Sequence, residues 1–316
     1  MLPKPETSPT TNIRKKKMSQ SVKDNITGYI FVSPFFILFS IFGLFPMIFS
    51  FYLAFFKWNG LGPMTFAGLD NFRIIFADAL FWKSIYNTVM IGLLGTVPQL
   101  IVAFLLAYAL NSQVVKFRNT FRVAIFMPYV TSIVAVAILF SIVFNNQSFG
   151  LVNSIIGLFG YDPIVFTQSE WGAKIAIASM IFWRWIGYNT IIYLAGMQSI
   201  SNELYEAAKM DGANLFQQLR YITIPVLKPF ILFTVFMGTI GSLQVFTEPL
   251  IFFNGNLRPE GITVVAYLYR DAFESNFFGT ASATAIVLFV LIMIFSLINL
   301  LFTNRVGRSK KRGASA

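Results

Sequence analysis

The chain has 316 residues, of which 56% are hydrophobic and 17% aromatic, whereas only 12% are charged. An ordinary soluble domain contains about 25% charged residues, so this composition argues against a soluble enzyme, a nucleic-acid-binding protein and a disordered scaffold. The formal net charge is +11, but most Lys and Arg residues lie in short clusters beside long uncharged runs, as in membrane proteins. The sequence has no Cys and no His, so we expect no disulfide, no metal site and no catalytic imidazole. These features predict an integral membrane protein.

The first segment, residues 1–27, is expected to be a disordered basic tail, because it is rich in Pro, Thr and Lys and has little to bury. Its cluster Arg14 to Lys17 is typical of a topology signal that contacts anionic lipid. The apolar run that follows is about twice as long as the core of a signal peptide, and no small-residue cleavage site follows it. We therefore expect this run to be retained as a membrane span.

Six apolar stretches are long enough to cross a hydrocarbon core of about 30 Å, which requires roughly 20 residues of helix. Residues 28–304 are therefore predicted to form an all-α domain with six transmembrane helices, followed by a second basic tail at 305–316. The third span takes only the first part of a longer apolar run. In chain order, the expected spans are Tyr29 to Phe56, Ser84 to Val115, Val123 to Phe144, Lys174 to Met197, Pro229 to Thr247 with a continuation to Asn254, and Ser275 to Asn304.

The orientation of the spans follows from the positions of the basic residues. Three clusters, Arg14 to Lys17, Lys116 to Arg122 and Arg305 to Arg312, fall on the same side when there are six spans. Cytoplasmic loops carry the excess of Lys and Arg, so that side is predicted to be the cytoplasm. The loop at 145–170 has neither Lys nor Arg and is expected to be external. Both termini are predicted to be cytoplasmic.

Residues 199–228, between the fourth and fifth spans, form the only predicted cytoplasmic connection long enough to fold by itself. Gly212 lies where a first helix must turn. A second short helix, Leu215 to Tyr221, is expected to end before Pro225 and Pro229, which would redirect the chain towards the fifth span. The pattern predicts a helix–turn–helix on the membrane surface.

Two interpretations of this surface segment remain open. Ser201 is a good helix N-cap, and Leu204, Ala207 and Ala208 form one apolar stripe along the helix that follows. Such a helix could simply lie in the membrane interface as an amphipathic connector. The small Ala residues and the mixed acidic and basic residues of its other face favour a surface on which another protein docks.

The same segment resembles a known family. Glu206-Ala207-Ala208, Gly212 and Ile222-Thr223-Ile224-Pro225 have the spacing of the EAA motif of binding-protein-dependent ABC importer permeases. The motif usually ends in Ile-x-Leu-Pro, and Ile224 is a mild departure of similar volume. Further segments resemble the sugar-uptake branch of that family: Gly68 to Phe72, Asn87-Thr88, Phe149 to Asn153, Asn254-Gly255, Tyr269 to Phe273 and Gly279 to Ala283.

The resemblance implies the fold of a type I ABC importer permease, which forms half of a translocation pathway. It implies four kinds of partner: a second homologous permease, two cytoplasmic ABC ATPase subunits, an extracellular solute-binding protein and the lipid of a bacterial plasma membrane. The chain has no G-x-x-x-x-G-K-[ST] loop, so we expect no enzyme activity and no cofactor in it, with ATP and Mg²⁺ bound by the ATPase subunits. The resemblance assigns the coupling to these ATPases to Tyr205, Glu206, Ala207, Ala208, Asp211, Gly212 and Pro225.

Charged groups inside spans are costly and are therefore functional candidates, and two are expected here, Arg184 and Glu248. The alternative is that they pair with each other for packing, or that each reaches towards a membrane surface. Aromatic faces beside amides and hydroxyls suit a sugar, whose apolar faces stack while its hydroxyls bond. The resemblance to the maltose-importer branch implies that the sugar pathway is lined by Tyr129, Trp183, Gly187, Asn189, Ser242, Gln244 and Glu248.

Three other functions are weighed against a sugar importer. The same architecture could import a polyamine, phosphate or glycerol phosphate, although an anionic solute would favour more pore cations than Arg184 alone. An ion-coupled secondary transporter would need buried carboxylates or broken helices in two related halves, and the sequence shows neither a repeat nor a second membrane carboxylate. A non-transporting assembly protein would not need the coupling segment.

Overall fold

The computed structural model describes residues 20–112 and 116–308, which are mostly helical. The chain divides into two units, residues 1–50 and residues 51–316. Five of the described helices are long and apolar enough to cross a membrane, and one bent pair of helices makes a sixth candidate. The predicted all-α membrane fold is confirmed, with five clear spans and the bent pair as the candidate for the sixth.

The first unit contains α1 (Gln20–Phe39), a π-helical turn η1 (Ser40–Leu44) and the start of α2 (Phe45–Leu53). Together they make one apolar helix close to the predicted first span. The helix begins at Gln20, inside the segment expected to be a disordered tail, because residues 20–27 contain neither Gly nor Pro to stop it. The rest of that tail, residues 1–19, lies outside the described residues, as does most of the C-terminal tail, residues 309–316.

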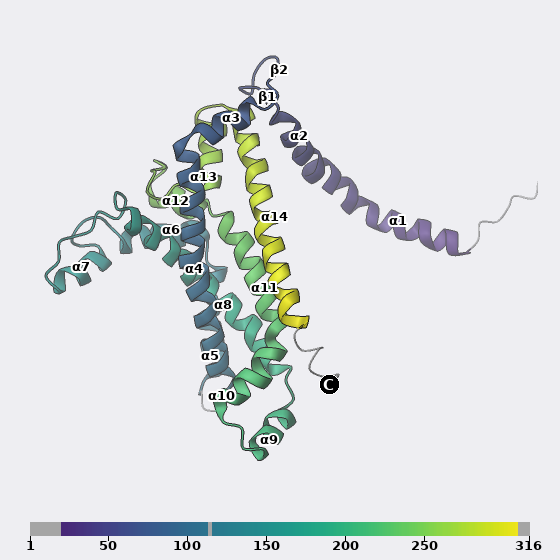
Figure 1. The fold of residues 1–316 in the computed structure, drawn as a ribbon, viewed down its shortest axis with the longest axis vertical. Helices are drawn as coiled ribbons and strands as arrows, with labels where there is room; N and C mark the ends of the chain where they lie inside the picture. Colours follow the sequence, from purple (N-terminus) through teal and green to yellow (C-terminus); the bar gives the residue numbers. More distant parts are fainter. Residues whose placement is uncertain (1–19, 113–115, 309–316) are drawn as a thin grey trace, which may run out of the picture. The chain divides into compact units, whose positions relative to one another are not determined.

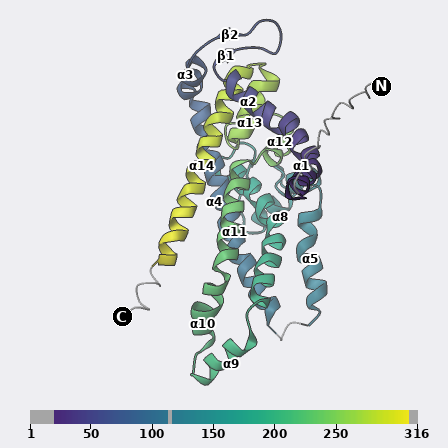
Figure 2. The same ribbon diagram turned by 90° about the vertical axis from the view of Figure 1, so that its right-hand side faces the viewer.

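The second unit is built around two long helices that lie side by side, α4 (Ala79–Asn111) and α8 (Glu170–Gln198). Small residues permit this contact: a Cβ on Gly95 of α4 would lie 3.1 Å from the carbonyl oxygen of Ala178. Two further long helices, α11 (Ile224–Leu243) and α14 (Phe278–Arg308), pack beside them (Figures 1 and 2). These four helices are the second, fourth, fifth and sixth predicted spans.

The third predicted span is not a single helix. It consists of α5 (Arg118–Val130) and α6 (Ile133–Val143), which are bent by 94° relative to each other at Thr131 and Ser132. Pro128 in the last turn of α5 has no N–H to donate, and Thr131 and Ser132 both have extended ψ angles, 143° and 130°. The prediction of one helix from Val123 to Phe144 was therefore wrong at its centre.

Short elements complete the two ends of the second unit. One end carries the antiparallel pair β1 (Phe56–Lys57) and β2 (Thr65–Phe66), with Phe56 opposite Phe66, together with α3 (Asp70–Ala77) and α13 (Val264–Tyr269). The opposite end carries α9 (Asn202–Met210) and α10 (Leu215–Gln218) (Figure 2). The remaining short elements are α7 (Leu151–Leu158), α12 (Thr247–Phe252), and the π-helical turns η2 (Leu219–Thr223) and η3 (Arg270–Glu274).

The two prolines that follow the surface segment do not redirect the chain. The helix runs without interruption from Leu215 to Leu243, through α10, η2 and α11. The widened turn η2 lies directly before Pro225, and a π-turn changes the hydrogen-bond pattern at the point where the proline has no N–H. The predicted change of direction at Pro225 and Pro229 was wrong for this reason.

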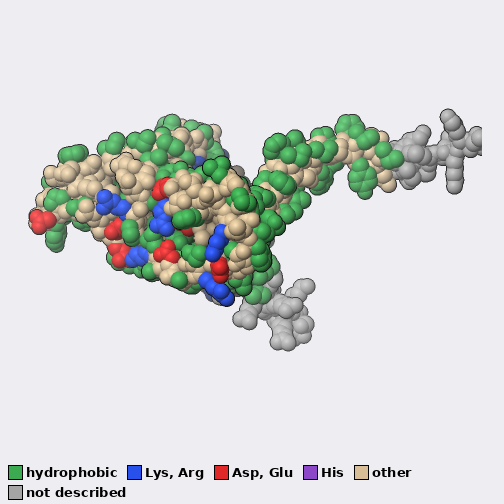
Figure 3. Space-filling view, turned by 90° about the horizontal axis from the view of Figure 1, so that it is seen from above, with side chains coloured by type: hydrophobic (Ala, Val, Ile, Leu, Met, Phe, Trp, Pro, Cys, Tyr) green, Lys and Arg blue, Asp and Glu red, His purple; other side chains and the backbone are tan. Residues whose placement is uncertain are grey.

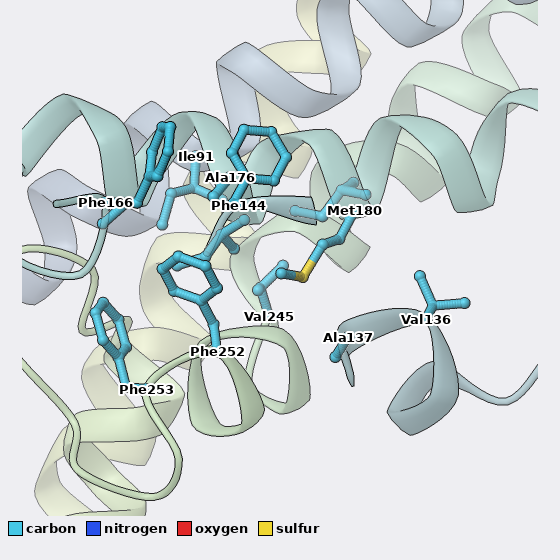
Figure 4. Close-up of a cluster of buried hydrophobic side chains, with 13 residues drawn as sticks. Ile91, Val136, Ala137, Phe144, Phe166, Ala176, Met180, Val245, Phe252 and Phe253 are labelled. Atoms are coloured by element: carbon cyan, nitrogen blue, oxygen red, sulfur yellow. The ribbon is translucent and has the colours of Figure 1, made fainter. Parts of the chain in front are cut away.

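An apolar cluster holds the short helices α6 and α12 against α8. The rings of Phe144 and Phe166 meet edge to face at 5.2 Å, and Phe252, Met180 and Val245 pack in the same cluster (Figure 4). Edge-to-face aromatic pairs add about 0.5–1.5 kcal/mol beyond their buried area. The cluster therefore fixes the segment after α11, which takes part in the candidate site.

Charged side chains of both signs are interspersed on the end that carries α3 and α13 (Figure 3). Arg270 lies 3.2 Å from Asp271, and Tyr267 donates a hydrogen bond of 2.8 Å to Asp78. Burial raises the pKa of Asp271 above its usual value, and the neighbouring Arg270 opposes this shift. These bonds join the start of α4 to α13 and η3.

Lys174, at the same end of α8, is a buried charge that the sequence reasoning did not single out. Its ammonium group lies 3.2 Å from the carboxylate of Glu170, which also contacts Lys83 of α4. It also lies over the rings of Tyr86 and Trp171, at 5.4 and 5.7 Å. A fully buried ammonium is tolerated because these groups replace its water.

The crossing of α5 and α8 depends on Gly187, since a Cβ there would overlap the carbonyl oxygen of Ile125. We expect Gly187→Ala to lower the stability of the folded protein by about 1–3 kcal/mol, the usual cost of overpacking. The matched control is Gly241→Ala in α11, where a Cβ would meet nothing within 4 Å. Thermal unfolding in detergent measures both variants. Equal midpoints for Gly187→Ala and wild type would contradict the prediction.

Candidate functional site

A cavity of about 160 Å³ lies inside the second unit, between α4, α6, α8, α11 and α12. Its lining is both aromatic and polar. The lining residues are Thr96, Gln99, Ile133, Ile181, Arg184, Trp185, Tyr188, Asn189, Met237, Gly238, Gly241, Ser242, Gln244, Val245, Phe246, Thr247 and Glu248.

The wall of this cavity includes a break in a membrane helix. α11 ends at Leu243, and the backbone leaves the helical conformation from Gln244 (φ −106°, ψ 14°) to Phe246 (φ −139°, ψ −52°) before α12 begins. Sequence reasoning treated the fifth span as continuous through this point. Pro249 explains the difference, because its ring would clash with the carbonyl of Val245 in a continuous helix. Non-helical backbone at membrane depth is tolerated where it lines a cavity, as it does here.

The two charges expected inside the spans, Arg184 and Glu248, both line this cavity. Among the described residues, no ion pair joins them, which does not support the packing alternative. The guanidinium of Arg184 instead lies over the rings of Tyr129 and Trp185, at 6.0 and 5.8 Å. Its Nε is buried and has no hydrogen-bond partner, and Glu248 is only 6% exposed. The cavity thus presents an unpaired donor from α8 and a carboxylate from α12.

An aromatic group lies beside these charges. Tyr129 at the end of α5 stacks on Tyr188 with ring centroids 4.7 Å apart, and Trp185 meets both rings edge-on at 5.3 and 5.6 Å. Gln99 of α4 is almost fully buried and donates a hydrogen bond of 3.1 Å to the carbonyl of Trp185. The arrangement offers flat apolar faces next to amides and hydroxyls.

The structure brings four of the seven predicted pathway residues into the cavity lining: Asn189, Ser242, Gln244 and Glu248. Tyr129 is not among the lining residues, but it contacts two of them, Tyr188 and Trp185, in the aromatic group. Trp183 packs against Phe140 of α6 in the apolar cluster, at 5.8 Å, and Gly187 lies at the crossing with α5.

Sequence reasoning missed Thr96, Gln99, Tyr188 and Thr247. The signal available for Gln99 was an amide within an otherwise apolar helix, directly after Pro98.

The surface segment at the opposite end has the turn that the sequence predicted. Ser201 caps α9 by accepting a hydrogen bond from the amide of Glu203 (3.3 Å). Gly212 has φ +78°, a left-handed conformation, and nothing lies within 4 Å of a Cβ built there. Asn214 and Gln217 form a reciprocal capping box that starts the next helix. The glycine is therefore favoured by its backbone angle and not by lack of space.

One side chain joins the two arms of this segment. The hydroxyl of Tyr205 in α9 lies 2.9 Å from the hydroxyl of Thr223 in η2, next to Pro225. Thr223 is buried and also bonds the carbonyl of Gln218. Because both hydroxyls lie inside the segment, this bond fixes the angle of α9 relative to the long helix.

The outward face of the segment is exposed and largely apolar. Met210 is 89% exposed, and Leu204, Leu215 and Phe216 are each at least half exposed. The motif residues Glu206, Ala207, Asp211 and Gly212 are exposed as well, and Ala208 is half-buried. Exposed apolar side chains grouped at a surface turn are typical of a contact with another protein or with a membrane surface.

A polar cavity enclosed by membrane helices and an exposed helical turn at one end define a multi-pass membrane permease. The chain belongs to the family described as the binding-protein-dependent transport system inner membrane component, whose model matches residues 99–308. It is 34% identical over 273 residues to the arabinooligosaccharides transport system permease protein AraP of Bacillus subtilis, covering 86% of this chain and 87% of AraP. It is 35% identical to the lactose transport system permease protein LacF of Rhizobium radiobacter, covering 88% and 93% of the two chains.

A solved structure agrees with this membership. The fold matches a chain of a bacterial ABC transporter that imports the acidic polysaccharide alginate, with a TM-score of 0.78 and 27% identity. The match covers 90% of this chain and 98% of that chain. The same alginate transporter has been solved with an alginate pentasaccharide-bound periplasmic protein, and that match also has a TM-score of 0.78.

The left-handed turn predicts an order among variants of Gly212. A β-branched residue is strained at φ +78°, whereas Asn tolerates this region, and the surrounding space is open for both. We expect Gly212→Val to lose most solute uptake per assembled complex and Gly212→Asn to keep most of it. Uptake into vesicles, normalised to the complex present, measures the difference. Similar uptake by the Val variant and wild type would show that the turn is not needed.

Proposed function

We propose that the chain is the membrane subunit of an ATP-driven ABC importer for a sugar or oligosaccharide. The observation that carries the proposal is the cavity, in which an aromatic group lies beside unpaired polar side chains, in a chain of this permease family. The chain forms half of the pathway, and a second homologous permease supplies the other half.

The chemistry of the cavity supports a sugar as the solute. A sugar ring has apolar C–H faces that stack on aromatic rings, and Trp185 and Tyr188 present such rings. Its hydroxyl groups need both donors and acceptors, which Asn189, Gln244 and Glu248 supply. The relatives named for arabinooligosaccharides and lactose support the same substrate class.

The exposed turn supports coupling to separate ATPases. We assign the docking of a cytoplasmic ABC ATPase to α9 and the turn after it, with Glu206, Ala207, Ala208, Asp211 and Gly212 at the contact. Tyr205 and Pro225 keep that contact in place relative to the long helix, as the Tyr205–Thr223 bond indicates. Two ATPase subunits bind ATP and Mg²⁺, and this chain binds no cofactor of its own.

The distribution of basic residues supports the topology and the location. With both termini and α9 in the cytoplasm, the end that carries α3 and α13 faces outwards, where an extracellular solute-binding protein delivers the sugar. The solved alginate transporter in complex with a periplasmic protein supports this partner. The proposed location is the plasma membrane of a bacterium.

The experiment that tests the proposal uses the complete complex in lipid, with its ATPase subunits and binding protein. Glu248→Gln and Gln244→Ala should each weaken the apparent sugar affinity in sugar-stimulated ATP hydrolysis, by roughly two- to twelvefold. The first variant replaces a charged acceptor with a neutral amide, and the second removes the amide that would bond a sugar hydroxyl. Ser179→Ala is the matched control, since its hydroxyl bonds only Ile175 of its own helix and lies outside the cavity. An unchanged sugar response in every stable cavity variant would refute the pathway.

The same experiment tests the packing role of the two charges. If Arg184 and Glu248 served only to pair, neutralising one would leave the other unpaired in low dielectric, and the yield of intact complex would fall. Neutralising both would then restore the yield. We expect instead that the single variants change the sugar response at unchanged yield, as the absence of an ion pair between them among the described residues indicates.

A further prediction concerns the source of energy. Purified alone in lipid, the chain should neither bind nor hydrolyse ATP, because its sequence has no phosphate-binding loop. Equilibrium binding of labelled ATP to the isolated subunit measures this, and the complex with its ATPases is the positive control. Stoichiometric binding to the isolated chain would overturn the assignment.

A further inference from the structure

The segment Pro259–Val264, called here the outer segment, is bonded along its length to α4. The side-chain amide of Asn87 donates through its Nδ2 to the carbonyls of Pro259 (2.8 Å) and Ile262 (3.0 Å). The hydroxyl of Thr88 accepts a hydrogen bond of 2.9 Å from the amide of Val264. Asn87 is fully buried, so these bonds are not exchanged for bonds to water. The outer segment is therefore held firmly to the second membrane helix.

The same segment is also packed against α8 and α12. The ammonium group of the buried Lys174 donates to the carbonyl of Glu260 at 3.3 Å. A Cβ on Gly261 would lie 2.7 Å from the ring of Phe253 and 3.0 Å from Ile177, so the backbone of the segment packs closely against both side chains. The outer segment thus contacts three helices that surround the cavity.

Its innermost bond reaches the break in the fifth span. The hydroxyl of Thr263, which is fully buried, donates to the carbonyl of Val245 at 2.6 Å. In a continuous helix this carbonyl would accept from the amide of residue 249, but that residue is Pro249 and has no N–H. Thr263 therefore supplies the donor that the proline lacks, and an unbonded carbonyl at this depth would be costly.

We propose that Thr263 is a positioning residue of the solute path. It fixes the non-helical turn Gln244–Phe246, whose side chains line the cavity, and it ties that turn to the outer segment. Pro259, the first residue of the outer segment, and Arg258 just before it are exposed. A contact on this surface is therefore linked to the cavity wall through the hydrogen bonds of the outer segment. The inference rests on the proposed function only in treating the cavity as the solute path.

The test uses the absence of Cys from the natural sequence, which allows clean single-cysteine labelling. In the complete complex, Gln244→Cys reports on the turn, and Met237→Cys reports on the same cavity from within α11. Thr263→Val removes the hydroxyl at nearly constant volume, and with it both the bond to Val245 and the longer N-cap bond from the amide of Ala266 (3.4 Å), whereas Thr263→Ser retains both. We expect Thr263→Val to change the labelling rate at position 244 by about two- to twelvefold, the effect of one net hydrogen bond on a local equilibrium. Labelling at position 237 should stay the same, and Thr263→Ser should restore the rate at 244.

A matched control separates this role from general packing. Thr284→Val removes an equally buried hydroxyl in α14, which donates a hydrogen bond to the carbonyl of Thr280 in the same helix. It should leave the labelling at 244 unchanged. Equal labelling at 244 in wild type and Thr263→Val, or an equal change at 237, would overturn the proposal. The labelling measurement does not depend on a sugar response. Absence of a sugar response in the wild-type complex would therefore refute the proposed function, but it would not change what the labelling rates show about Thr263.

A second variant keeps the proposal testable if Thr263→Val does not fold. Pro249→Ala supplies an amide N–H that can donate to the Val245 carbonyl in place of Thr263. The double variant Thr263→Val with Pro249→Ala should therefore recover the yield of folded complex that Thr263→Val loses. No recovery of yield would contradict the role assigned to the Thr263 hydroxyl.

Discussion

Every backbone N–H and C=O inside a bilayer must find its partner within the protein, and this constraint decides where the chain can leave the helical conformation. In the described part of the bundle, two membrane helices are interrupted, at Thr131–Ser132 and at Gln244–Phe246. Each interruption lies close to a proline, Pro128 or Pro249, that removes a helical donor. At the second, the freed carbonyl is bonded by Thr263, so the break is stable because another segment supplies the missing group.

Both interruptions open onto the same cavity. Ile133, the first residue of α6, lines it from one side, and Gln244 to Phe246 line it from another. The bend allows α6 to turn away from the line of α5, while the apolar cluster around Phe144 and Phe252 holds α6 and α12 together. The polar cavity thus lies where two helices are interrupted close to prolines, and the close α4–α8 and α5–α8 contacts keep the surrounding helices in position.

The sequence predicted the number and location of the spans well, because a bilayer sets the length of an apolar helix. It also predicted the turn at Gly212, which depends on local backbone preference alone. It could not predict what a proline does, since that depends on neighbouring hydrogen bonds. Pro225 is accommodated by the turn η2, whereas Pro128 precedes a bend of 94°.

Site residues were harder to predict for a related reason. Helix periodicity gives the relative directions of side chains but not which direction faces the cavity. Trp183 and Trp185 are two positions apart on α8, and only Trp185 lines the cavity, while Trp183 packs in the apolar cluster. Asn87 carries no local signal of its role either, because its partners Pro259 and Ile262 lie more than 170 residues further along the chain.

The continuous helix from Leu215 to Leu243 connects the two parts of the proposed mechanism. Its 29 residues span about 44 Å at 1.5 Å per residue, close to the full thickness of a bilayer with its headgroups. One end is joined to α9 by the Tyr205–Thr223 bond, and the other end is the wall of the cavity at Ser242 and Gln244. Had the prolines redirected the chain as expected, a displacement of α9 could have been absorbed at that bend. Because the helix is unbroken, a displacement of α9 would be carried along its axis to the non-helical turn, which the Thr263–Val245 bond ties to the outer segment. In the proposed mechanism, the position of the break, at the far end of this continuous helix, is therefore where events at the ATPase would reach the solute path.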